Sequence, residues 1–102
     1  MKHSKLFIFA IMTTLAVSGC KHQAATYPTD TLTTKNGSQL TITSFKHASL
    51  AIETEGRHIY IDPISQYADY ASLPKADLIL ITHSHYDHLD SAAVAALSPA
   101  AT

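Results

Sequence analysis

One stretch of this chain restricts its possible folds and functions most: an apolar run that stops abruptly at three histidines and an aspartate. Residues 78–81 are Leu-Ile-Leu-Ile, and His83, His85, Asp87 and His88 follow closely. The apolar run predicts a fully buried strand, whose end can present side chains from a rigid scaffold. Imidazole nitrogens and a carboxylate together are typical ligands of zinc and related first-row divalent metals.

The spacing of these four side chains predicts two metal positions in one pocket. Side chains two residues apart on an extended segment point the same way, so His83 and His85 can bind one ion together. Asp87 and His88 come after the chain starts to turn, so they face a second point nearby. The alternative is a solvated, histidine-rich loop, which is disfavoured because the ligand-type residues directly follow the apolar run.

Three segments resemble a known family. Residues 83–88, His-Ser-His-Tyr-Asp-His, match the HxHxDH signature of the metallo-β-lactamase superfamily of metal-dependent hydrolases at every fixed position. Residues 59–63, Ile-Tyr-Ile-Asp-Pro, resemble the strand-ending aspartate motif that precedes this signature. Residues 45–50, Phe-Lys-His-Ala-Ser-Leu, resemble the HAS/T segment of the UlaG-like branch, which includes lactonases and phosphodiesterases. The resemblance covers residues 40–97 approximately.

The resemblance implies a binuclear metallohydrolase. His83 and His85 would bind the first metal, and Asp87 and His88 would bind the second. Two zinc ions are expected, although manganese or iron suits the same ligands. A metal-bound hydroxide would attack an ester, lactone or phosphodiester of a small-molecule substrate. Asp87 would also act in catalysis, by orienting the nucleophile or taking its proton.

Two further residues are expected to support the ligands. Asp62 ends a predicted strand, where its carboxylate could hold the second N–H of a ligand histidine or the amides of the ligand loop. The alternative for Asp62 is a simple turn-forming Asp-Pro pair. His47 resembles a family histidine near the pocket, and the alternative is a partly buried histidine at a strand end.

The remaining pattern predicts an α+β fold. An antiparallel strand meander is expected, with Asn36 and Gly37 in a hairpin turn. The predicted strands are residues 32–34, 39–45, 48–53 and 58–61. Their alternating aliphatic residues should face inward, as Ile59 and Ile61 do in the last strand. Residues 64–74 are expected to form a loop or a short helical turn.

A short helix should complete the described pattern. Asp90 is a good N-cap for a helix over residues 91–97, and Pro99 would stop it. By resemblance, the whole is the N-terminal half of a four-layered αββα sandwich, with residues 31–102 forming an incomplete domain. Its sheet would keep open edges and an uncovered face.

The first residues of the chain resemble an export signal and are not expected to belong to the folded domain. Lys2 and Lys5 precede the mostly apolar residues 6–17, a run too short to span a membrane comfortably. Residues 17–20, Val-Ser-Gly-Cys, resemble the lipobox of bacterial lipoproteins. Residues 1–19 are thus expected to be a signal peptide, Cys20 to be lipidated, and residues 20–30 to be a tether. The alternative for Cys20 is a buried structural thiol.

These features predict a lipid-anchored protein of the bacterial cell envelope, facing the periplasm or the outside. Cys20 is the only cysteine, so an internal disulfide is excluded. Two of the seven basic residues lie in the signal peptide, so the eight acidic residues outnumber the basic ones in the remainder. Without a basic patch, a nucleic-acid partner is not expected.

The chain departs from the family downstream of the signature. Family members carry a further histidine, a metal-bridging aspartate and a final histidine there. With two ligands per metal, where catalytic zinc usually has three from protein, we expect weak zinc binding and little or no hydrolysis. The expectation is an N-terminal piece of a longer hydrolase. The alternative is an inert or merely metal-binding lipoprotein.

Overall fold

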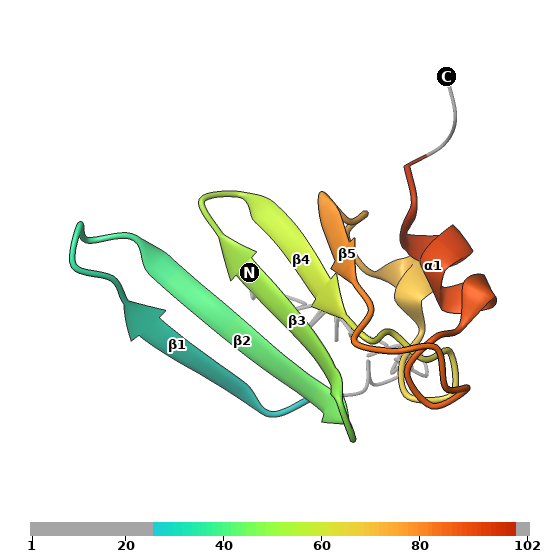
Figure 1. The fold of residues 1–102 in the computed structure, drawn as a ribbon. Coiled ribbons are helices and arrows are strands. Elements are labelled where there is room, and N and C mark those ends of the chain that lie inside the picture. The colour runs from blue at the N-terminus through green and yellow to red at the C-terminus, as the bar shows by residue number, and fades with distance from the viewer. Residues whose placement is uncertain (1–25, 100–102) are drawn as a thin grey trace, which may run out of the picture.

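The computed structural model describes residues 26–99, which form one five-stranded sheet with a short helical layer on one face (Figure 1). Two short helical segments lie between and after the strands. The elements are β1 (Thr29–Thr33), β2 (Gln39–Lys46), β3 (Ser49–Thr54), β4 (Arg57–Ile61), the 3-10 helix η1 (Tyr70–Ser72), β5 (Leu78–Leu80) and α1 (Ser91–Leu97). The α+β class predicted from the sequence is confirmed.

The strands follow one another across the sheet in chain order. β1 to β4 are antiparallel neighbours, as the predicted meander requires, whereas β5 pairs with β4 in parallel. A parallel neighbour needs a crossover connection, and residues 62–77, which include η1, provide it. As a consequence, the chain leaves β4 and β5 at the same edge of the sheet.

The N-terminal boundary of the sheet differs from the predicted one. β1 begins at Thr29, where Thr29 pairs with Thr43, so the last two residues of the expected tether belong to a strand. Tyr27 also stacks edge-to-face on Phe45, with 4.8 Å between ring centroids. Residues 1–25, which include the predicted signal peptide and Cys20, lie outside the described residues.

The β1–β2 hairpin forms where Asn-Gly predicted it, but with a different turn. Among the residues of this turn, only Gly37 has a positive φ, of 86°, and its N–H donates to the carbonyl of Thr34. The Thr34 N–H in turn donates to the carbonyl of Ser38. The hairpin is therefore closed by a loop longer than two residues, in which Gly37 has left-handed backbone geometry and Asn36 does not.

The core lies on the sheet face opposite to the one predicted. Tyr60 is 2% exposed, and it packs with buried residues of the η1 and α1 region. These partners are Ala68, Tyr70, Ala93 and Leu97. Because neighbouring side chains of a strand point to opposite faces, Ile59 and Ile61 must face away from this core. The prediction that both isoleucines face inward is therefore wrong for the core formed by residues 26–99.

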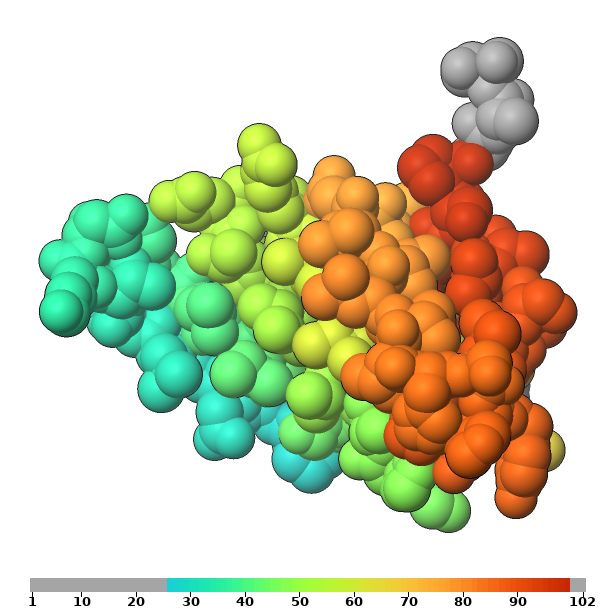
Figure 2. Space-filling view, in the orientation of Figure 1, coloured from blue at the N-terminus to red at the C-terminus, as the bar shows by residue number. Residues whose placement is uncertain are grey.

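We call the other side of the sheet the aliphatic face. Strand pairing places nine aliphatic side chains on this face: Leu32, Leu40, Ile42, Leu50, Ile52, Ile59, Ile61, Leu78 and Leu80. No helix or strand of residues 26–99 covers this face. Figure 2 shows the strands crossing the visible side of the molecule in chain order, from β1 to β5. The sequence analysis expected an uncovered face, and the structure identifies it as the aliphatic one.

The β5 strand is therefore not fully buried, contrary to the prediction. Leu78 and Leu80 are each 47% exposed, and only Ile79 packs against the core. A continuous apolar run indicates burial on both faces, but the described residues cover one face alone. The apolar pattern of β5 matches a strand with a second layer, which residues 26–99 do not supply.

Helix α1 begins and ends as predicted. The Asp90 side chain accepts a hydrogen bond from the Ala92 N–H, at 2.9 Å, and the helix ends at Leu97, two residues before Pro99. Asp90 also accepts from the Ser65 N–H, at 2.7 Å, so its carboxylate joins the loop after β4 to the helix. Within residues 26–99, no helix has the length and apolar character needed to cross a bilayer.

Replacing a leucine with alanine should destabilise the fold far more in the core than on the aliphatic face. Leu97 is fully buried, so Leu97→Ala should lower the free energy of unfolding by about 2–5 kcal/mol. Leu78 is half exposed, so Leu78→Ala should cost about 1 kcal/mol or less. Urea unfolding followed by circular dichroism checks both, and equal costs would contradict the assignment of the core.

Candidate metal centre

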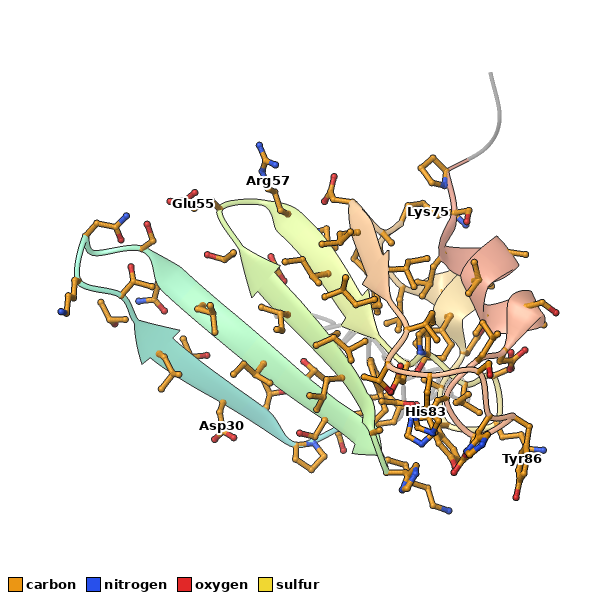
Figure 3. All side chains as sticks on the ribbon, in the orientation of Figure 1. Asp30, Glu55, Arg57, Lys75, His83 and Tyr86 are labelled. Atoms are coloured by element: carbon orange, nitrogen blue, oxygen red, sulfur yellow. The ribbon has the colours of Figure 1, made fainter. Side chains whose placement is uncertain are left out.

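Three loops meet at one edge of the sheet and bring the predicted ligand residues together. They are the β2–β3 turn with His47, the loop after β4 with Asp62, and the segment after β5. Figure 3 shows His83 and Tyr86 at one end of the molecule, away from Arg57 and Lys75. The parallel arrangement of β4 and β5 places both of their carboxyl ends at this edge.

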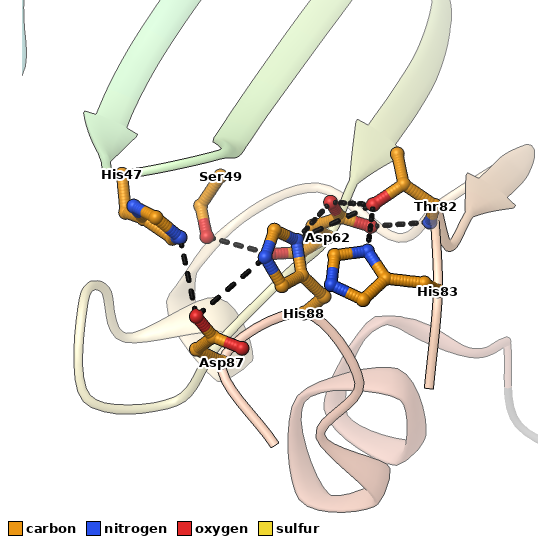
Figure 4. A network of polar contacts seen from close by, with 7 residues as sticks. All are labelled: His47, Ser49, Asp62, Thr82, His83, Asp87 and His88. Atoms are coloured by element: carbon orange, nitrogen blue, oxygen red, sulfur yellow. Dashed lines mark hydrogen bonds and ion pairs between the residues drawn. The ribbon is translucent and has the colours of Figure 1, made fainter. Parts of the chain in front are cut away.

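Asp62 lies at the base of the cluster and is fully buried. Its Oδ1 accepts from the Thr82 N–H at 2.7 Å, and its Oδ2 accepts from the Thr82 hydroxyl at 2.6 Å. The same Oδ2 is 2.8 Å from His88 Nδ1 (Figure 4). Asp62 thus contacts both a ligand-type histidine and a loop amide, which are the two contacts considered for it from the sequence.

The backbone of Asp62 also shapes the loop. Its φ is +46°, and its N–H donates to the carbonyl of Leu80 at 2.9 Å. Left-handed backbone is uncommon outside glycine, although aspartate and asparagine adopt it more readily than most residues. The turn-forming alternative for Asp62 is thus compatible with its contact to His88, and its role in supporting a metal ligand stays a prediction.

The charge of Asp62 follows from its surroundings. Burial raises the pKa of this carboxyl, but hydrogen bonds from Thr82 and His88 outweigh it, so the pKa lies below its usual value. Asp62 is therefore a carboxylate at neutral pH, and a carboxylate can only accept hydrogen bonds. His88 must then carry a proton on Nδ1, which leaves Nε2 free as a metal ligand.

The ligand-type residues form two groups, each within 4.8 Å between potential ligand atoms. One group is His83, His85 and Asp87, and the other is His47, Asp87 and His88. The predicted pairs therefore lie together, and Asp87 belongs to both groups. His47, expected only beside the pocket, has its Nε2 3.3 Å from Asp87 Oδ2.

The donor set fits divalent zinc. Zinc takes imidazole and carboxylate ligands, and each group brings two imidazoles and one carboxylate within 4.8 Å of one another. The His83 and His88 rings are 3.7 Å apart between centroids, and His88 Nε2 is 3.6 Å from Asp87 Oδ2. Such crowding of basic nitrogens around one carboxylate suits a cation. The roles of these residues as ligands stay a prediction.

A pocket of about 140 Å³ adjoins Asp87. It is lined by Ile64, Gln66, Tyr67, Tyr86, Asp87 and Asp90. Tyr67 thus lies beside the candidate metal centre, with Lys46 Nζ 5.5 Å from its ring centroid, whereas Tyr70 is buried in the core. Tyr86 is 90% exposed and covers little. Because Asp87 lines this pocket, a substrate group bound there would lie against its carboxylate.

Sequence reasoning missed two residues of this site. Ser49 is 1% exposed, and its hydroxyl donates to the carbonyl of Asp62 at 2.5 Å, which connects the start of β3 to the loop after β4. Thr82 contacts Asp62 through both its N–H and its hydroxyl. Threonine and serine are common everywhere, so the only signals were that Ser49 lies in the quoted segment 45–50 and that Thr82 directly precedes the segment 83–88.

Known proteins resemble the chain over the same residues. The profile of the family described as "Beta-lactamase superfamily domain" matches residues 41–99. A metal-dependent hydrolase from Flavobacterium johnsoniae is 49% identical over 53 residues, or 47% of this chain and 24% of that protein. One from Aeropyrum pernix is 39% identical over 71 residues, or 59% of this chain and 27% of that protein.

A solved structure resembles the fold as well. The crystal structure of a protein from Parabacteroides distasonis, titled as a metal-dependent hydrolase, superposes with a TM-score of 0.72 at 48% identity. The match covers 74% of this chain and 34% of that protein. The chain therefore spans about a quarter to a third of the length of these relatives. Because the family profile covers more than half of the chain and the fold agrees, the chain belongs to the metallo-β-lactamase superfamily.

Proposed function

We propose that the protein of this chain is a divalent-metal-dependent hydrolase that works at the cluster around Asp87. The observation that carries the proposal is the meeting of two ligand groups on one carboxylate. Two zinc ions suit the histidine-rich donor set, and manganese or iron would be accepted by the same atoms. An ester, lactone or phosphodiester is the proposed substrate bond.

The residues of the cluster have distinct tasks in this proposal. A bound divalent ion supplies an acidified water and polarises the substrate oxygen. Asp87 Oδ2 lies 3.3 Å from His47 Nε2 and 3.6 Å from His88 Nε2, so this carboxylate can orient a water or take its proton. The adjoining pocket with Tyr67 and Ile64 would receive the substrate next to Asp87.

A second candidate is a protein that binds metal without catalysis. It is favoured by the sharing of Asp87, because two bound ions would divide five side chains of residues 26–99 between them. If Asp87 binds only one of the ions, the other keeps two protein ligands, which leaves that ion largely hydrated and weakly held. Hydrolysis therefore separates the two candidates, while metal binding is common to both.

The proposed function is tested with the metal-loaded chain and three chromogenic substrates: an aryl ester, a lactone and a phosphodiester. Metal-dependent hydrolysis of one of them should be slow, because the described residues supply few ligands for each ion, and it should be lost in His83→Ala. It should persist in His58→Ala, which removes a histidine from β4 that belongs to neither ligand group. Metal binding without hydrolysis would favour the second candidate, and activity that survives His83→Ala would contradict the proposed site.

We also propose that Cys20 carries a lipid that anchors the protein in the bacterial envelope, facing the periplasm or the outside. The support is the sequence alone: a basic start, an apolar run and Val-Ser-Gly-Cys. Several acyl chains on one residue would hold the protein stably on a membrane, where a single chain binds only marginally.

Metabolic labelling with an alkyne fatty acid tests the anchor. Label should be incorporated into the wild-type chain and should be absent from Cys20→Ala, which should also leave the membrane fraction. Lys21→Ala, one residue away, is the matched control and should remain labelled. Equal labelling of Cys20→Ala would contradict the anchor.

A further inference from the structure

Thr82 lies where the buried carboxylate of Asp62 meets two imidazole rings. Its Oγ1 is 2.6 Å from Asp62 Oδ2, 3.1 Å from His83 Nδ1 and 3.3 Å from His88 Nδ1 (Figure 4). Its N–H donates to Asp62 Oδ1 at 2.7 Å. The threonine is therefore fixed from two sides by one buried side chain.

The direction of each hydrogen bond follows from proton counting. A carboxylate only accepts, so the single proton of the Thr82 hydroxyl points to Asp62 Oδ2. The hydroxyl oxygen then has only lone pairs left for His83 Nδ1, so this nitrogen must carry the proton and donate. His88 Nδ1 carries a proton for the same reason, since it faces Asp62 Oδ2 directly.

We propose that Thr82 is a positioning residue that relays the acceptor of Asp62 to His83, so that one buried carboxylate orients a histidine in each ligand group. His83 belongs to one group and His88 to the other. The proposal deepens the metal-binding function and rests on it. Thr82 itself needs no contact with metal or substrate, because it acts through the rings of the two histidines.

The relay makes the ring of His83 unusual in a measurable way. A free neutral imidazole carries its proton mainly on Nε2, whereas the relay holds it on Nδ1 and leaves Nε2 as the ligand atom. The ring of His85 makes no hydrogen bond to residues 26–99, so it should keep the ordinary tautomer. The two histidines of one ligand group are therefore internal references for each other.

Tautomers in the metal-free, full-length chain test the relay. Long-range ¹H–¹⁵N correlation spectra at about pH 8, where ordinary histidines are neutral, should show Nδ1–H for His83 and His88 and mainly Nε2–H for His85. Thr82→Val keeps the backbone N–H and the shape but loses the hydroxyl. It should return His83 to Nε2–H and leave His88 unchanged, while Thr82→Ser should restore the wild-type pattern.

Zinc affinity gives a second readout, measured by competition with a chelator. Thr82→Val should bind zinc about 10- to 100-fold more weakly than the wild type, as is usual when a partner of a ligand histidine is lost. Thr82→Ser should bind nearly as tightly as the wild type. A general loss of fold in Thr82→Val would affect His88 and His58 as well, so unchanged spectra of these two rings distinguish a local effect.

The two readouts separate failure of the relay from failure of the proposed function. Zinc binding by a wild-type chain whose His83 is Nε2–H would overturn the relay and leave the metal centre standing. Nδ1–H at His83 in a chain that binds no zinc would support the relay as geometry and remove the proposed function. Unchanged tautomer and unchanged affinity in Thr82→Val would overturn the relay outright.

Discussion

Asp62→Ala is expected to lower the free energy of unfolding by about 3–5 kcal/mol, because it removes a fully buried carboxylate that pairs with His88. This carboxylate accepts from the N–H and hydroxyl of Thr82 and from His88 Nδ1. All three donors would lose their acceptor, and the loss is most costly at His88, whose side chain is only 12% exposed. Urea unfolding monitored by circular dichroism measures the loss.

Two other variants separate the carboxylate from the unusual backbone of Asp62. Glu55→Ala is the matched control, since Glu55 is also an acid with a positive φ, of 51°, but is exposed and should matter little. Asp62→Asn keeps a residue that tolerates positive φ while it loses acceptor capacity. Stability equal to wild type in Asp62→Asn would contradict the role assigned to the carboxylate.

Asp87→Ala is expected to weaken zinc binding at both positions together, because Asp87 is the one side chain common to the two ligand groups. The loss of affinity should exceed the roughly 10- to 100-fold that follows from losing a partner of a ligand. His85→Ala should weaken only the group with His83. Chelator competition with zinc measures both affinities.

Asp30→Ala is the matched control for Asp87→Ala. Asp30 is an exposed aspartate on β1, far from His83 in Figure 3, so its removal should leave zinc binding unchanged. If Asp87→Ala kept one position at wild-type affinity, Asp87 would not be shared. The two ligand groups would then be independent sites, contrary to the proposed arrangement.

Local patterns in the sequence were enough to predict where several features of the fold and the candidate site lie. The ligand cluster, the Asp90 cap and the β1–β2 hairpin depend on residues close together in the chain, where period and turn chemistry act directly. The sequence predicted that Asp62 holds a ligand histidine or an amide of the ligand loop without saying which, and the structure places it within hydrogen-bonding distance of His88 and of the Thr82 N–H.

Other features depend on contacts between distant segments. Alternation shows that Tyr60 and Ile59 face opposite ways, but which face the helical layer covers is decided by how residues 62–99 fold back. In the structure, the helical layer covers the face that carries Tyr60. His47 could not be placed beside Asp87 from spacing, since 40 positions separate them and only the sheet register brings them together.

The central claim is that the histidine–aspartate cluster at the sheet edge binds divalent metal. Native mass spectrometry of the full chain, titrated with zinc, counts the bound ions most directly. We predict two zinc ions for the wild type and for His58→Ala, and none for a variant in which His83, His85, Asp87 and His88 are all alanine. An unchanged ion count in that fourfold variant would contradict the claim.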